Sequence, residues 1–291
     1  MILYWLFLSF IFIISLCWGS FLNVVAYRCI HNKYFLKTRS YCPNCQSTLA
    51  WYDLIPLISW LLLKGKCRTC NVKISPVYPL IEFSCALTIT LYSHALLINY
   101  SKLHGFIWLN NFKLLSLPIL SHLFIMVIFF SALLINTATD FHTLSVLQLF
   151  TLWPIPLFWL ASWYGIMPLS YVESILGSII GYGILWITAR LFKYIKGYDG
   201  MGEGDFEILA LIGTVTGPLG ILNTVFIASC AGSVCGIFYL LKTKKTTNTA
   251  LPFGPFLALG AFCYMMSNPI TLRHKTEQYN FKKPVLFNSL T

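Results

Sequence analysis

Long apolar runs dominate this sequence, and each is close to the roughly 20 residues that an α-helix needs to cross the hydrocarbon core of a bilayer. Within lipid only helices and closed barrels satisfy their backbone hydrogen bonds, and runs of this length favour helices. Hydrophobic residues make up 57% of the chain and charged residues only 10%, whereas soluble domains carry about 25% charged residues. The sequence therefore predicts an all-α polytopic membrane protein.

The runs predict about eight transmembrane helices, over residues 2–22, 79–98, 118–137, 144–165, 170–192, 206–220, 221–241 and 252–268. The division near residue 220 rests on Gly217, Pro218 and Gly220, and a single bent helix there would reduce the count to seven. The first run lacks the basic start of a secretory signal, so we interpret it as a retained anchor. The predicted regions are a first helix (1–22), a loop (23–78), a helical core (79–268) and a polar tail (269–291).

The loop over residues 23–78 holds eight lysines and arginines against one acid, Asp53. Basic loops face the cytoplasm in membrane proteins, so this loop predicts an N-terminus on the outside. Counting helices forward then places Asp140 and Asp205 together on the cytoplasmic side. The net charge of +11 is explained by topology, and because the basic residues form no aromatic-interleaved stripe, we expect no nucleic-acid binding.

The same loop contains two CxxC pairs, Cys42 with Cys45 and Cys67 with Cys70, separated by 21 residues. Thiolates on two tight turns converge well on one tetrahedral zinc ion. The alternative is a pair of disulfides, which a reducing cytoplasm disfavours. Four sulfur ligands would leave no position for a catalytic water, so we predict a structural zinc site. The apolar segment 51–63 between the pairs either lies on the inner membrane surface or forms the core of the zinc module.

The stretch over residues 200–205, Gly-Met-Gly-Glu-Gly-Asp, places three glycines and two acids between apolar runs. It is either a flexible loop in which Asp205 caps the next helix or half of a catalytic site. Asp140, after another apolar run, is the candidate partner: two carboxylates that share a proton can hydrolyse an amide. Gly202 and Gly204 would then let an extended substrate backbone approach Asp205. The six histidines show no ligand spacing, and Ser/His/Asp, P-loop and HExxH patterns are absent.

Taken together, these motifs resemble the type IV prepilin leader peptidases, bifunctional bacterial enzymes with a membrane aspartyl protease and an N-methyltransferase activity. The resemblance covers most of the chain and is carried by residues 19–25 with Arg28, the two cysteine pairs around 51–53 and 55–56, Ser75 with 78–82, 200–205, and 252–260. The sequence departs from the family pattern at Leu147, where proline is usual, at His142, where many members have an acid, and at Glu207, where lysine is common.

The resemblance implies a multi-pass protein of the bacterial inner membrane whose active site faces the cytoplasm. Its substrates within the bilayer would be prepilins and pseudopilins, cleaved after a glycine, and the new N-terminal residue would be methylated with S-adenosylmethionine. Asp140 and Asp205 match the two catalytic aspartates. No glycine-rich nucleotide motif follows a predicted strand, and we expect the zinc-organised loop, including Gly65, to hold the methyl donor.

Two functions of other classes stay open at this point. A noncatalytic membrane scaffold of a pilus or type II secretion assembly would use the cysteine loop for docking and would tolerate Asn at both aspartates. An ion-coupled transporter would use paired carboxylates as a cation or proton pathway and would release no peptide product.

Overall fold

The computed structural model of the chain describes residues 2–31, 39–104, 117–198, 200–243 and 252–267. In this part the secondary structure is helical, with two isolated β-bridges and no strand, which confirms the all-α class. The predicted tail over residues 269–291 lies outside the described residues. The helices are α1 (Ile2–Ile30), η1 (Trp51–Leu54), α2 (Ile58–Leu62), α3 (Val77–His104), α4 (Leu117–Thr143), α5 (Gln148–Thr151), α6 (Pro154–Trp163), α7 (Tyr171–Lys196), α8 (Glu203–Thr243) and α9 (Gly254–Ser267).

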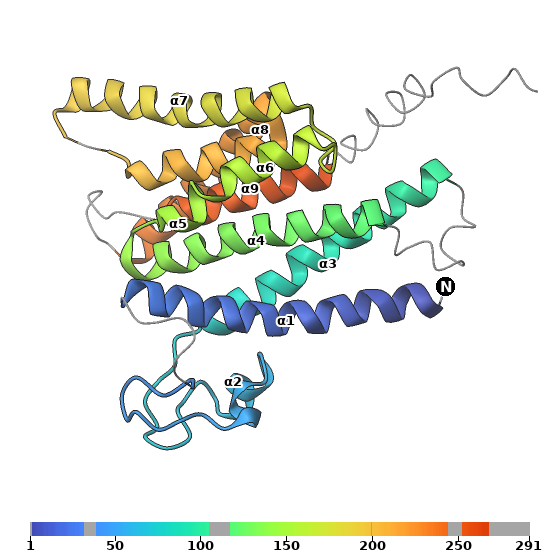
Figure 1. Ribbon diagram of the computed structural model, residues 1–291. Coiled ribbons are helices and arrows are strands. Elements are labelled where there is room, and N and C mark those ends of the chain that lie inside the picture. Colours follow the sequence, from blue (N-terminus) through green and yellow to red (C-terminus); the bar gives the residue numbers. More distant parts are fainter. Residues whose placement is uncertain (1, 32–38, 105–116, 199, 244–251, 268–291) are drawn as a thin grey trace, which may run out of the picture.

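Five of these helices, α1, α3, α4, α7 and α8, are long and apolar enough to cross a membrane, and α9 is a shorter apolar helix. The long helices run side by side, and α1 and α7 lie on opposite sides of the bundle (Figure 1). Both outer helices expose large apolar side chains, among them Trp5 and Phe10 on α1 and Ile179 and Ile187 on α7. Such extended exposed apolar surface is expected of helices that face lipid.

Two predicted helices differ from the observed ones. Helix α1 continues beyond residue 22 to Ile30, because its polar end packs against α3, where the Asn23 amide donates to the Tyr78 carbonyl at 3.0 Å. The predicted helix over 144–165 is instead two short helices, α5 and α6. Pro154 has no N–H with which to continue the earlier helix and instead occupies the first turn of α6.

Helix α8 folds back on itself at Gly217, whose φ of 69° and ψ of −178° are not helical. Residues 208 and 232 would be about 36 Å apart in a straight helix. Both lie beside the start of α9: a Cβ on Gly254 would be 3.1 Å from Ile208, and a Cβ on Gly232 would be 3.5 Å from the Phe256 ring. The predicted break near Gly217 is therefore present, while the total of eight crossings stays a prediction.

Small residues let α7 and the first half of α8 pack closely. A Cβ on Gly177 would lie 2.1 Å from the Gly213 carbonyl oxygen, and one on Gly181 would lie 2.5 Å from the Leu209 carbonyl oxygen. Close backbone approach of this kind, favoured by small residues, stabilises helix pairs in membranes. The contact fixes where α8 begins, at the end of the bundle where α4 also ends (Figure 1).

Candidate active site and metal centre

Asp140 lies in the last turn of α4 and is 6% exposed. Its Oδ2 accepts a hydrogen bond of 3.1 Å from the backbone N–H of Gly254, the first residue of α9. A helix N-terminus presents free N–H groups and a partial positive charge, which suits a carboxylate. A Cβ on Gly254 would lie 3.0 Å from the same oxygen, so glycine permits this close approach. Residues far apart in the chain thus fix one carboxylate of the candidate pair.

Asp205 lies in the first turn of α8 and is partly buried. It is close enough to Asp140 for the charges of the two carboxylates to interact. The structure therefore brings together the two acids that the sequence paired, one from α4 and one from α8. A pair of acids that acts as one unit must interact in this way, and the catalytic roles of the two residues stay a prediction.

The turn after α4 packs against the glycine-containing stretch. Leu144 adopts a positive φ of 51° and reverses the chain, and the Asn136 side-chain oxygen accepts from the Leu147 N–H at 2.9 Å. This places Val146 over Gly204, where an added Cβ would lie 2.4 Å from Val146. Gly202 has open space around it: apart from its chain neighbours, no atom of the described residues lies within 4 Å of an added Cβ. Gly204 is thus required for packing. Of the two glycines predicted to let a substrate backbone approach Asp205, Gly202 is the one with space beside it.

The four cysteines converge at the other candidate site, where their sulfur atoms all lie within 4.8 Å of one another. The Sγ atoms of Cys42 and Cys70 are 3.8 Å apart. A tetrahedral zinc with Zn–S bonds of about 2.3 Å requires S–S separations of about 3.8 Å. The cluster can therefore hold a metal ion of this kind with little rearrangement.

Each cysteine pair lies on the same local structure, repeated at an interval of 25 residues. The bridge between Tyr41 and Thr48 in the first turn corresponds to the bridge between Lys66 and Lys73 in the second. The next residue after each pair, Gln46 or Asn71, has a φ of 56°. This internal duplication is visible in the printed sequence only as the repeated CxxC, because the residues around it differ.

Hydrogen bonds prepare most of these thiols to become thiolates. Backbone N–H groups of Cys70 and Thr69 lower the pKa of Cys67, and the N–H of Val72 with the Asn44 side chain lowers the pKa of Cys70. Burial instead raises the pKa of the Cys42 thiol to about 11. Metal ligation requires thiolates. The positive charge of a bound cation would stabilise the thiolate form of this buried sulfur.

Gly65, the predicted cofactor residue, has a structural reason to be glycine. It is buried, its φ is 67°, and an added Cβ would lie 2.8 Å from the Trp60 ring. Its N–H donates to the Trp60 carbonyl at 2.9 Å and its carbonyl accepts from Ile74 at 2.8 Å. These contacts fold the second turn of the cysteine loop, and a role in holding a methyl donor stays a prediction.

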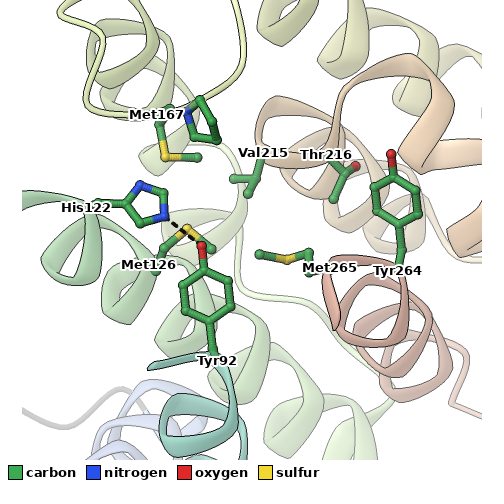
Figure 2. A pocket seen from close by; sticks show the side chains of 9 residues that line it. Tyr92, His122, Met126, Met167, Val215, Thr216, Tyr264 and Met265 are labelled. Atoms are coloured by element: carbon green, nitrogen blue, oxygen red, sulfur yellow. Dashed lines mark hydrogen bonds between the residues drawn. The ribbon is translucent and has the colours of Figure 1, made fainter. Parts of the chain in front are cut away.

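A small cavity of about 20 Å³ lies between α3, α4, α8 and α9, near the bend of α8 (Figure 2). His122 borders it, with Nε2 2.6 Å from the Tyr92 hydroxyl and Nδ1 3.0 Å from the Ile166 carbonyl. Both ring nitrogens thus have hydrogen-bond partners within the bundle. Methionines supply much of the lining, and the cavity has room for about one water. The cavity lies at a contact between helices, and its lining contains no Asp, Glu, Lys or Arg.

Comparison with known proteins decides the family. Residues 13–96 match the bacterial peptidase A24 N-terminal domain, and residues 127–237 match the type IV leader peptidase family. A type 4 prepilin-like proteins leader peptide-processing enzyme of Escherichia coli is 33% identical over 83% of this chain and 87% of its own length. The chain belongs to the type IV leader peptidase family.

Other relatives of this leader peptidase agree over nearly their whole length. Proteins named prepilin leader peptidase/N-methyltransferase are 32% identical in Pectobacterium carotovorum, over 89% of this chain and 93% of theirs, and 30% identical in Aeromonas salmonicida, over 90% and 91%. No solved structure matches the chain. The first family match contains the cysteine module and the second contains both aspartates, so both candidate sites lie in matched regions.

Glu207 marks where this leader peptidase departs from the family pattern, and the structure gives it partners. The buried carboxylate accepts from the Gln148 amide at 2.9 Å and from the Thr151 hydroxyl at 2.7 Å. It therefore fixes α5 to α8 two residues after Asp205. The sequence analysis did not predict these partners. The available signal was the presence of two polar residues, three positions apart, in an apolar run. His142, another departure, has a side chain outside the described part.

We expect Glu207→Leu to lower the rate of leader removal at least tenfold, because α5 and the turn over Gly204 lose their attachment to α8. Hydrogen bonds to a charged group contribute about 1.5–3 kcal/mol each, and two are lost. Glu207→Gln, which keeps the shape and an acceptor oxygen, is the control and should retain most activity. Cleavage rates and thermal unfolding of both variants in the same membranes measure the effect. Wild-type cleavage by the Leu variant would contradict this role.

Proposed function

We propose that this protein is a membrane aspartyl endopeptidase that removes the leader from type IV prepilins and pseudopilins after a glycine and then methylates the new N-terminal residue. The observation that carries the peptidase is the placement of Asp140 and Asp205, from separate helices, at one end of a bundle with lipid-facing outer surfaces. The methyl transfer is supported by the names of relatives that match along most of the chain.

The proposed hydrolysis uses the two carboxylates as one unit with a single proton. The ionised carboxylate takes a proton from a water molecule as the water oxygen attacks the peptide carbonyl carbon. The protonated carboxyl then supplies its proton to the amide nitrogen as the C–N bond breaks. The Gly254 N–H orients Asp140 throughout, and the open space at Gly202 would admit the extended peptide beside Asp205.

We place this end of the bundle at the cytoplasmic face of the bacterial inner membrane. The basic cysteine loop joins α1 to α3 at the same end as the aspartates (Figure 1), and basic loops remain in the cytoplasm. A prepilin with its apolar segment in the bilayer would present its basic leader on this side. The scission site would then lie at the depth of the two carboxylates.

We further propose that Cys42, Cys45, Cys67 and Cys70 hold a structural zinc ion, which cross-links the two turns of the loop and leaves no ligand position open. S-adenosylmethionine would supply the methyl group. The cysteine loop, with the Gly65 turn between exposed Lys64 and Lys66, would hold it near the new N-terminus. This part of the proposal rests on the names of relatives and on the order that the loop has around its cysteines.

Incubation of the purified protein with a prepilin and S-adenosylmethionine tests the proposal, with the mass of the product as readout. Loss of the leader reports the peptidase, and an added methyl group on the shortened product reports the transferase. An intact prepilin would favour the scaffold function, and an ion flux without peptide product would favour the transporter.

A further inference from the structure

The segment between the cysteine pairs exposes its apolar side chains instead of burying them. Helices η1 and α2 contain no buried residue. Trp51 is 76% exposed, Leu61 65% and Leu62 77%, and Ile58 is also exposed. The sequence left open whether this segment forms the core of the cysteine module, and these exposures exclude that alternative. Apolar surface of this kind requires an occupant.

The depth of α2 along the bundle points to the bilayer as that occupant. The Leu57 N–H, at the start of α2, donates to the buried Glu82 carboxylate of α3 at 2.9 Å. Glu82 in turn touches α1 at Gly19, where an added Cβ would lie 2.9 Å from the Glu82 Cα. Gly19 lies inside the apolar run of α1, about 16 Å before the helix ends at Ile30. The start of α2 is therefore held beside the bundle at a depth reached by lipid, and Figure 1 shows α2 on the α1 side of the bundle.

The neighbouring helices also expose large apolar side chains near the point where α2 is attached. Exposed large apolar residues near the Gly19–Glu82 contact are Phe21 on α1 and Leu80 and Phe83 on α3. The aromatic residues Trp51 and Tyr52 begin the segment, and such side chains favour the headgroup layer. Large apolar side chains are thus exposed on α1, on α3 and on the segment that contains α2.

The charges around α2 suit a lipid surface with anionic headgroups. Arg68 donates to Asp53 at 2.8 Å and its guanidinium lies 4.9 Å from the centre of the Tyr52 ring, which neutralises the acid of the module. Lys64 follows α2 by two residues and is exposed, as are Lys66 and Lys73. Lysines next to an inserted apolar segment contribute electrostatic attraction to anionic lipid.

We propose that the segment 51–62 inserts into the cytoplasmic leaflet, with α2 among the acyl chains and the lysines at the headgroups. The insertion holds the cysteine module against the bilayer, so that its metal site stays beside the bundle. This inference concerns lipid contact alone and does not depend on the peptidase or transferase activity.

Photocrosslinking tests the proposal on the full chain, loaded with zinc and reconstituted in liposomes of phosphatidylethanolamine and phosphatidylglycerol. Benzoylphenylalanine is placed at Leu62 or Leu61, and at Thr69, an exposed polar position of the same module, as the matched control. We expect lipid adducts by mass spectrometry at positions 61 and 62 in several-fold higher yield than at position 69. Bound zinc, measured on each labelled protein, shows that the module is folded.

Equal yields of lipid adduct at positions 62 and 69, in protein that retains zinc, would overturn the proposal. A second arm adds a prepilin before irradiation. If the label at 62 then transfers from lipid to the prepilin, the apolar face is a substrate-docking surface and the lipid assignment fails. Unchanged lipid adducts in the presence of prepilin support the insertion.

Discussion

Replacing Asp205 with Asn is expected to leave the helical bundle intact and to lower leader removal by about 10²- to 10⁴-fold, the usual contribution of a group that transfers a proton. Asn has nearly the same shape as Asp and cannot exchange the proton that the pair needs. Asp205 lies in the first turn of α8 and is partly exposed, so the substitution removes little packing. Conversion of a prepilin to its shortened product in membranes measures the loss.

Asp140→Asn is expected to have an effect of the same size, because the amide oxygen can still accept the Gly254 N–H and keep α9 in place. The double variant should be no worse than either single variant, since groups that act as a unit are not additive. Glu203→Gln is the matched control, because it removes an exposed carboxylate from the turn of α8 that contains Asp205. Full cleavage by either Asn variant would exclude the paired mechanism.

The pairing of Asp140 with Asp205 could be predicted because it needs only hydropathy, basic residues and the glycine pattern around one acid. The cysteine site could be predicted for a similar reason, since the spacing within each CxxC fixes a local turn. The hydrogen bond from the Gly254 N–H to Asp140 could not be predicted, because it joins residues 114 positions apart. Sequence periodicity carries no information about which helix end meets which carboxylate.

Some helix boundaries could be predicted from the sequence, and others depend on tertiary contacts. The break in α8 was predictable because Gly217 and Pro218 disrupt a helix wherever they occur. The division of residues 144–165 into α5 and α6 was missed although Pro154 and Pro156 lie within it, because a uniformly apolar run hides a turn that tertiary contacts stabilise. Asn136 and Glu207 supply those contacts from α4 and α8.

Removal of the proposed zinc ion, by chelation or by Cys67→Ser, is expected to unfold the cysteine module over residues 39–76 while the helical bundle persists. Apart from Cys42, Gly65 and Cys67, this segment buries no residue, so we expect its order to depend on the proposed cross-link between the two turns. Structural zinc contributes about 10–16 kcal/mol to the folding of small zinc-finger peptides. The folding free energy lost with the ion is therefore larger than the remaining packing of the module can supply.

The functional result should separate the two activities. We expect Cys67→Ser to abolish methyl transfer and to leave leader removal within a few-fold of wild type, because Asp140 and Asp205 are held by α4, α8 and α9, whereas the module lies between α1 and α3. Cys235→Ser, at an exposed cysteine of α8, is the control and should change neither activity. Product mass reports both reactions in one assay. If cleavage and methylation fall by the same factor, the module stabilises the whole protein and is no separate transferase site.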